Sequence, residues 1–298
     1  MQCLECKEKE DVVLIPVYKR DWIFCNACGS ATSVREKKNI IFSLLNYEFL
    51  KRKHNEEDIY DYFESPEHQK VSQKNYDNFC ALFSKYLTGL ETKNIIDISG
   101  GSGHFLKLYK SKYSLLTEIN DKAINFAKRQ LNLNALKFNF NQQRIDELIN
   151  VHEAEKKFDL VFLNACTMFC EDMKGFIDSL KSILNEDATI IVHANVQPTV
   201  GVVVRTQFDD HSYLVLRQKI RLRRYFENQF TLLEEATYED LYPQYVTSHD
   251  LNPLTRLLKI FYTEKAIMKL VQDKSSNPSF RYKDRHVFYQ VYKYNLAV

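Results

Sequence analysis

The chain has 298 residues, and its 41 Lys and Arg against 39 Asp and Glu give a formal net charge of +2. That balance argues neither for nor against a nucleic-acid partner. No apolar run reaches membrane-spanning length, and the first residues do not resemble a secretion signal, so we expect a cytoplasmic globular protein of one or two domains.

Four of the seven cysteines form two C-x-x-C pairs near the start of the chain. They are Cys3, Cys6, Cys25 and Cys28, with eighteen residues between the pairs. This spacing is typical of a tetrahedral zinc site. A segment this short cannot bury enough apolar surface to fold alone, so we expect a bound metal to stabilise it. Iron fits the same spacing, four unliganded thiols are the alternative, and disulfides are disfavoured without a secretion signal.

Two short apolar segments between the cysteine pairs, residues 12–18 and 21–24, predict the strands of a zinc ribbon over residues 1–35. A stretch rich in aromatic and charged side chains follows at 36–90. Within it, residues 69–86 carry apolar side chains at helical spacing, which predicts a helix ahead of the next domain.

Three of the seven glycines fall within four residues, at Gly100, Gly101 and Gly103. The apolar run before them, 94–98, predicts a buried strand, and residues 104–109 predict the start of a helix. Glycine permits positive φ and close approach of the backbone to a ligand. Strand, glycine turn and helix together predict a nucleotide-like ligand at the carboxyl end of the first strand. The dinucleotide pattern G-x-G-x-x-G fails, because Leu106 occupies its third glycine position.

Apolar runs and amphipathic helices alternate after the glycine turn. Further strands are expected at 113–117, 137–141, 158–164, 188–193 and 285–292, with helices over 121–131 and 174–184. Continuous apolar strands separated by helices predict a parallel sheet buried on both faces. This core spans 91–298, with an insertion at about 195–270 in which only residues 230–233 resemble a further strand.

The glycine turn resembles motif I of the class I S-adenosylmethionine-dependent methyltransferases, D-x-G-x-G-x-G, with a serine at its first glycine. The resemblance covers about a hundred residues and implies a Rossmann-like α/β fold with helices on both faces. It implies that S-adenosylmethionine is bound by Asp97, Ser99, Gly100, Gly101 and Gly103, with Glu118 on the ribose hydroxyls. It also implies contacts from Asn164 and, near the adenine, from one of Asn139, Asn141 and Asp146. The helix before the first strand often covers the cofactor cleft in this family, and Tyr62 is then a substrate contact or part of a packed aromatic seam.

A zinc ribbon followed by this core is similar to bacterial methyltransferases of sugar-modifying and surface-polysaccharide pathways, which implies a small-molecule substrate. Ribosomal RNA guanine methyltransferases also join a zinc module to this fold, so an RNA methyltransferase is the second hypothesis. A cofactor-binding protein without catalysis is the third. It is suggested by Ser99 and by Cys166-Thr167-Met168, which stand where family members often carry Leu-Glu-His.

The insertion contains a basic cluster, residues 217–224, with five cations and no acid. In a pocket wall it predicts a phosphorylated or nucleotide-linked substrate, with contacts from Arg217, Arg221 and Arg223, and a solvated helix face is the alternative. Transfer to an alcohol needs a general base. The candidates are His193 and His211, then Asp209 and Asp210, although a lone histidine is more often structural than catalytic. The balanced charges of the ribbon favour a small molecule over RNA.

Overall fold

The computed structural model describes residues 2–17, 20–33, 65–153, 157–196, 215–237 and 287–295. These residues belong to two compact units. The ribbon unit contains the N-terminal strands and residues 215–223, and the sheet unit contains most of the large sheet and its helices. The expected substrate contact Tyr62 and the candidate bases Asp209, Asp210 and His211 lie outside the described residues.

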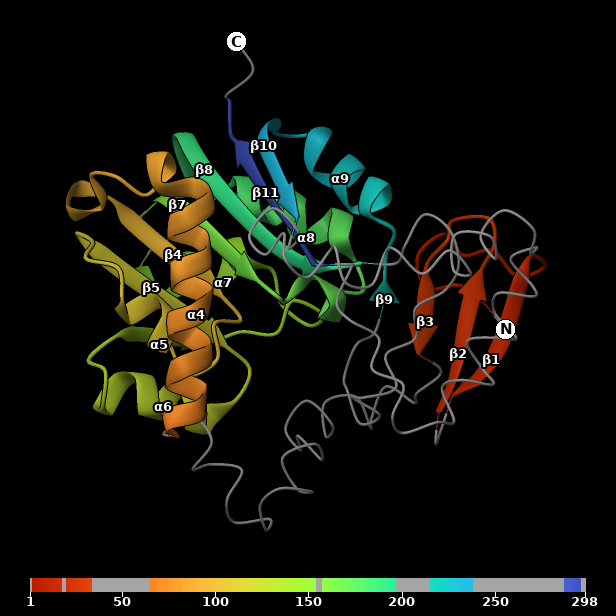
Figure 1. Cartoon of the computed structure of the whole chain (residues 1–298), viewed down its shortest axis with the longest axis horizontal. Coiled ribbons are helices and arrows are strands. Elements are labelled where there is room, and N and C mark those ends of the chain that lie inside the picture. The colour runs from red at the N-terminus through yellow and green to blue at the C-terminus, as the bar shows by residue number, and fades with distance from the viewer. Residues whose placement is uncertain are drawn as a thin grey trace, which may run out of the picture. The chain divides into compact units, whose positions relative to one another are not determined.

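The ribbon unit is built on a four-stranded antiparallel sheet (Figure 1). Its strands, in sheet order, are β1 (Val12–Val17), β2 (Arg20–Cys25), β3 (Ala31–Ser33) and β9 (Val215–Leu216). The expected strands at 12–18 and 21–24 are confirmed. Strands β3 and β9 were not expected, because two or three residues are too few to show the period-two pattern that marks a strand.

The large sheet has seven strands in the order β10-β11-β8-β7-β4-β5-β6. Four neighbouring pairs are parallel: β4 with β5, β4 with β7, β5 with β6, and β7 with β8. The expected Rossmann-like fold is therefore confirmed. The strands are β4 (Asn94–Ile98), β5 (Tyr113–Glu118), β6 (Asn134–Lys137), β7 (Phe158–Asn164), β8 (Leu184–Asn195), β10 (Thr231–Thr237) and β11 (Val287–Lys293).

The third strand of the core is not where the apolar pattern suggested. The expectation was residues 137–141, whereas β6 ends at Lys137. It begins at the exposed Asn134, and only Ala135 within it is fully buried, so the strand itself shows little pattern. The buried Phe138 that drew the prediction lies just after the strand and fills the core from the exit loop.

Helices flank the large sheet, and the long helix α4 crosses in front of it in Figure 1. Phe79 and Phe83 of α4 are fully buried, and the Phe79 ring lies 5.2 to 5.8 Å from the rings of Phe105, Phe162 and Tyr289. Side-chain caps begin several helices, as Asn120 does by accepting from two backbone N–H groups. The helices are α4 (Pro66–Phe83), α5 (His104–Lys107), α6 (Asp121–Arg129), α7 (Ile145–Glu153), α8 (Met173–Lys181) and α9 (Lys219–Glu227).

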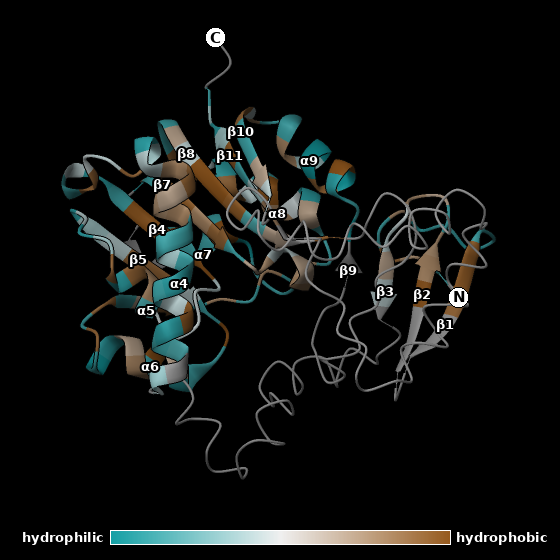
Figure 2. Ribbon diagram, viewed as in Figure 1, coloured by the Kyte–Doolittle hydropathy of each residue, from teal (hydrophilic) through white to brown (hydrophobic). Residues whose placement is uncertain are grey.

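The centre of the sheet carries the apolar core. Figure 2 shows strongly hydrophobic segments in β7 and β8, whereas polar colours dominate α4 and α9. Ile95, Ile96, Val161 and Ile190 have no exposed surface at all. Such strands are typical of a parallel sheet covered on both faces. Among the described helices, none combines the length and apolar character needed to cross a bilayer.

The order of the strands positions a ligand site. Strand β4 has β5 on one side and β7 on the other, so successive connections leave it in opposite directions. In open α/β sheets the crevice at such a switch point, beyond the carboxyl ends of the strands, is where ligands bind. A ligand would therefore lie against the residues at the carboxyl ends of β4, β5, β7 and β8.

Candidate functional site

The glycine turn connects β4 to α5 at the carboxyl edge of the sheet. Ser99, Gly101 and Gly103 have positive φ values of 59°, 61° and 82°. Glycine adopts this region freely, whereas serine there is uncommon. A Cβ atom on Gly100 would lie 2.3 Å from Asp97 Oδ2, so the turn packs directly on that carboxyl group. Ser99 thus keeps the left-handed backbone conformation in spite of its side chain.

Asp97 is fully buried beneath the turn. Neither of its carboxyl oxygens has a hydrogen-bond partner among the described residues. Burial raises the pKa of this carboxyl group well above its usual range, and the charge of Glu118 raises it further. A buried polar group without a partner is costly, which points to a ligand or water that completes its hydrogen bonding. The orphaned carboxyl and the glycine cradle fit the expected cofactor.

Glu118, the last residue of β5, braces the same turn. One carboxylate oxygen accepts the N–H of Gly101 at 3.0 Å, and the other accepts the N–H groups of Ile119 and Asn120 at 2.8 and 3.1 Å. Burial raises the pKa of Glu118, and these three amides oppose that effect. A carboxylate offers about four acceptor sites, so this arrangement leaves one for a ligand hydroxyl.

His68 is a residue at this edge that the sequence patterns did not single out. It lies in the first turns of α4, and its Nδ1 is 3.1 Å from the hydroxyl of Ser102, a fully buried residue of the glycine turn. Burial lowers the pKa of His68 to about 4, with the nearby His104 adding to the effect, so the ring is neutral at pH 7. The contact ties α4 to the turn. A single histidine on a helix gives no sequence signal for such a role.

Asn164 and His193 form a pair at the ends of β7 and β8. The two residues are direct partners in the strand register, and His193 Nδ1 lies 2.7 Å from Asn164 Oδ1. With the amide oriented in this way, its oxygen can only accept, so the proton belongs on Nδ1 and the lone pair on Nε2. The ring of His193 stacks on Tyr289 at 4.7 Å and meets the edge of Phe79 at 6.2 Å. The expected base is thus held in one orientation and one tautomer.

The three candidates for the adenine contact have different surroundings. Asn141 donates to the carbonyl of Phe169 at 2.8 Å and accepts the N–H of Glu171 at 2.9 Å, which ties the exit of β6 to the segment after β7. Asn139 accepts the N–H of Asn141. Asp146 is ion-paired with Arg144 at 2.8 Å. Asn141 is therefore the candidate that connects two loops of the carboxyl edge.

In the ribbon unit, the four N-terminal cysteines come together as the spacing predicted. Their sulfur atoms all lie within 4.8 Å of one another, with 3.6 Å between Cys3 and Cys28 and 3.4 Å between Cys6 and Cys25. All seven cysteines of the chain are free thiols. Four sulfurs at a Zn–S distance of about 2.3 Å would be about 3.8 Å apart in a tetrahedron. The cluster has the size of a tetrahedral metal cage.

Backbone amides point at the sulfur atoms of this four-cysteine cage. The pKa of Cys3 is lowered by its hydrogen bond with Cys28 and by the N–H groups of Cys6 and Glu5. Burial raises the pKa of Cys25 to about 12, against the N–H of Cys28, and the bond with Cys3 raises the pKa of Cys28. Because a metal binds thiolates, loading the cage must release protons, and the amides stabilise the resulting charge.

The basic cluster 217–224 is partly used within the ribbon unit. Arg217 is 2% exposed, and its Nε lies 2.7 Å from Glu5 Oε2, while Arg221 Nε lies 3.3 Å from Glu5 Oε1. The sequence suggested substrate contacts for Arg217 and Arg221 and gave no sign of their pairing with Glu5, because Glu5 is far away in the sequence. Arg223 is half-buried and Arg224 is exposed.

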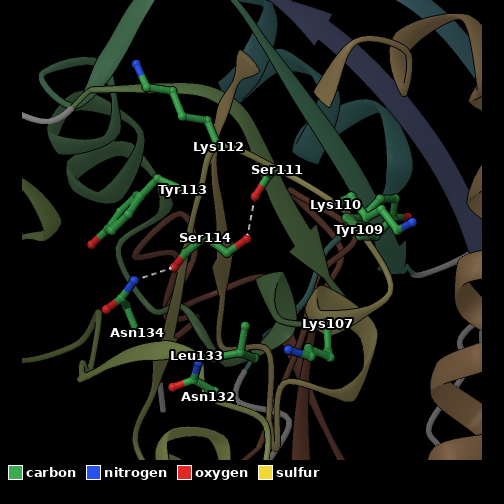
Figure 3. Close-up of a pocket in the computed structure, with 10 residues that line it drawn as sticks. All are labelled: Lys107, Tyr109, Lys110, Ser111, Lys112, Tyr113, Ser114, Asn132, Leu133 and Asn134. Carbon is green, nitrogen blue, oxygen red and sulfur yellow. Dashed lines mark hydrogen bonds between the residues drawn. The ribbon is translucent and has the colours of Figure 1, made fainter. Parts of the chain in front are cut away.

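A cavity of about 530 Å³ lies elsewhere, at the amino ends of β5 and β6 (Figure 3). Tyr113, Ser114, Leu133 and Asn134 line it, and Asn134 donates to the carbonyl of Ser114 at 3.3 Å. Lysines also line it, but in Figure 3 the ammonium groups of Lys110 and Lys112 point away from each other. The glycine turn follows the carboxyl end of β4, whereas this cavity lies at the amino ends of the neighbouring strands, so the two sites are separate.

Comparison with protein families gives one match. Residues 90–235 match the family described as a methyltransferase domain. This range begins just before β4 and ends within β10, so it contains the glycine turn, Glu118, Asn164 and His193. No curated protein sequence matches the chain significantly.

Several solved structures resemble the chain. The N-methyltransferase NodS from Bradyrhizobium japonicum WM9 has a TM-score of 0.46 and 10% identity, covering 75% of this chain and 96% of its own. A complex between the Haloferax volcanii Trm112 methyltransferase activator and a methyltransferase has a TM-score of 0.48 and 13% identity, and the match covers 80% of this chain and 97% of that one. The geranyl diphosphate C-methyltransferase from Streptomyces coelicolor A3(2) has a TM-score of 0.48 and 10% identity, and the match covers 74% of this chain and 76% of that one.

Proposed function

We infer that this chain, which carries an S-adenosylmethionine-dependent methyltransferase domain over residues 90–235, methylates a small anionic metabolite with the help of a histidine base. The observation that carries the proposal is the Asn164–His193 pair at the same sheet edge as the glycine turn. The bound cofactor supplies an electrophilic methyl group. The chain's own task is to hold the acceptor in line, exclude water and remove its proton.

In this proposal Asn164 acts on His193 rather than on the cofactor. Its amide oxygen holds the Nδ1 proton, so Nε2 is the nitrogen that takes the proton of an acceptor hydroxyl or amine. The stacking of His193 on Tyr289 fixes the plane of the ring. His211 remains a second candidate base from the sequence.

The cofactor is proposed to lie over Gly100, Gly101 and Gly103, with Asp97 and Ser99 beneath and beside it and Glu118 on the ribose. Asn141 is proposed at the adenine end. Three observations support this assignment: the positive φ values in the glycine turn, the absence of a hydrogen-bond partner for the Asp97 carboxyl group among the described residues, and the acceptor site of Glu118 that its three backbone partners leave open.

Replacing Glu118 with alanine is expected to weaken S-adenosylmethionine binding by about ten- to a hundredfold. The variant loses the hydrogen bond that a ligand hydroxyl donates to a charged acceptor, worth about 1.5–3 kcal/mol, and it also leaves three backbone N–H groups without their partner. Isothermal titration calorimetry measures the affinity. Glu147→Ala, at an exposed position on α7, is the matched control. Unchanged affinity in Glu118→Ala would contradict the ribose assignment.

The substrate is proposed to be a nucleotide-linked sugar or another phosphorylated compound of polysaccharide biosynthesis. Its anionic group would meet Arg223, with Tyr62 also at the pocket. Arg217 is buried against Glu5, which removes this cation from any surface that could bind a phosphate backbone, and Arg221 is partly engaged by the same carboxylate. This supports a small molecule over RNA, because a nucleic-acid surface should carry a clear positive excess.

Arg223→Ala is expected to raise KM about ten- to a hundredfold for an anionic acceptor and to leave cofactor affinity unchanged, since a charge-assisted hydrogen bond is lost. The assay follows S-adenosylhomocysteine formation with a panel of nucleotide-linked and phosphorylated sugars. Arg224→Ala, the same change at the next, exposed position, is the control. A KM equal to that of the control would remove Arg223 from the pocket.

The RNA hypothesis makes a different forecast for the same protein. Binding to structured RNA would weaken steeply with salt, in proportion to the phosphates contacted. Filter binding over a salt series measures this. Tight, salt-sensitive RNA binding together with methyl transfer to RNA would contradict the metabolite proposal. Cofactor binding without turnover on any acceptor would favour a non-catalytic protein.

The metal of the four-cysteine cage is proposed to be zinc, one ion per chain. Zinc favours four thiolates in a tetrahedron, and the sulfur spacing and buried sulfurs support it. Elemental analysis of the purified protein distinguishes zinc from iron, which binds the same ligand set.

A further inference from the structure

Glu5 is a buried carboxylate inside the first cysteine pair. It stands between Cys3 and Cys6, its side chain is 1% exposed, and each of its oxygens faces one arginine. Arg217 is itself 2% exposed, whereas Arg221 is 33% exposed. Burying these charged groups costs free energy, because the desolvation of an ion pair offsets much of its electrostatic attraction. A further favourable interaction within the ribbon unit would offset this cost.

The segment that supplies the two arginines is fitted to the cage. Strand β9 pairs with β3, which follows the second cysteine pair, through Ala31 with Leu216 and Thr32 with Val215. The side chain of Gln218 fills the space beside Gly29, where a Cβ atom would lie 2.1 Å from Gln218 Nε2. Gly29 has a φ of +66° and directly follows Cys28. Both halves of the cage therefore contact residues 215–221.

The charges of this arrangement suit a loaded cage. Four thiolates around one divalent cation carry a net charge of −2, whereas two arginines and Glu5 together carry +1. In a buried environment this opposite charge is worth more than in water. The two arginines therefore favour the metal-loaded form of the cage.

We propose that Arg217, with Arg221, is an outer-sphere part of the metal site, and that metal loading orders residues 215–223. The inference rests on the proposed zinc site. Glu5 connects the arginines to the first cysteine pair, and its own N–H points at the sulfur of Cys3. Outer-sphere partners of metal ligands commonly change metal affinity by about ten- to a hundredfold when they are removed. The segment that leads into α9 is then held in place by the metal.

The first test measures zinc affinity by competition with a chromophoric chelator. Arg217→Met keeps an unbranched, mostly apolar stem and removes the charged guanidinium, and it is expected to weaken zinc binding about ten- to a hundredfold. Arg224→Met, the same change at an exposed position of α9, should leave the affinity at the wild-type value. Equal affinities in the two variants would overturn the proposal. Wild-type protein that binds no zinc would overturn the zinc site itself, a distinguishable result.

The second test needs no variant. Hydrogen exchange of wild-type protein is compared before and after zinc is removed with a chelator. Backbone amides of residues 215–223 are expected to lose protection together with those of β2 and β3, while β4 and β7 keep theirs. Unchanged protection of 215–223 in the zinc-free protein would contradict the coupling even if Arg217→Met failed to fold.

Discussion

Cys25→Ser is expected to abolish zinc binding and to unfold the ribbon unit, while the large sheet stays folded. Binding of a structural zinc ion by four cysteines contributes about 10–16 kcal/mol in small metal modules. Among the described side chains of the ribbon sheet, the buried apolar ones other than cysteine are Ile23, Phe24 and Ala31. Losing the metal therefore removes most of what holds it.

The single tryptophan makes this measurable. Trp22 lies on β2, so its fluorescence reports on the ribbon, while the circular dichroism of the whole chain is dominated by the larger unit. Elemental analysis gives the zinc content in parallel. Cys80→Ser, a cysteine of α4 outside the cage, is the matched control and should keep both zinc and fluorescence. Full zinc content in Cys25→Ser would contradict the ligand set, and loss of the large sheet would contradict its independence.

His193→Gln is expected to lower kcat by about a hundred- to ten-thousandfold, because glutamine cannot take up the proton of the acceptor. Its amide can still donate to Asn164, so the local structure should survive. Cofactor affinity, measured by calorimetry, should equal that of the wild type. Asn164→Ala should lower kcat by a smaller factor, since it frees the ring to adopt the wrong tautomer.

Full turnover in His193→Gln would assign the histidine a structural role in the stack with Tyr289. Loss of cofactor binding in the same variant would also contradict the proposal, because it would place His193 among the cofactor contacts. The two outcomes are separated by running calorimetry and the turnover assay on one preparation.

Sequence patterns predicted the strands that are apolar along their whole length. The bounds of β7 were predicted as observed, because each of its ends is marked by a change in polarity. Strand β6 was misplaced because its four residues include one buried side chain. The cysteine cage followed from spacing alone, since two tight pairs must meet if they bind one metal.

Contacts between distant residues could not be predicted in this way. The basic cluster was recognised, but nothing in its composition reveals that Arg217 is buried against Glu5. The pairing of Asn164 with His193 depends on the register of two strands, which a single sequence does not determine. Likewise, His68 acquires its role only because α4 packs beside the glycine turn.

The pairing of β3 with β9 bears on the order in which the chain is synthesised and folded. The four cysteines are synthesised well before Leu216, the residue with which Ala31 pairs. Contacts this distant in sequence form late, because a long loop must close first. During synthesis the young ribbon exposes an unpaired strand edge, which is a hazard for aggregation. Early capture of zinc by the cysteines would protect it, so zinc-starved cells should accumulate the protein in insoluble form.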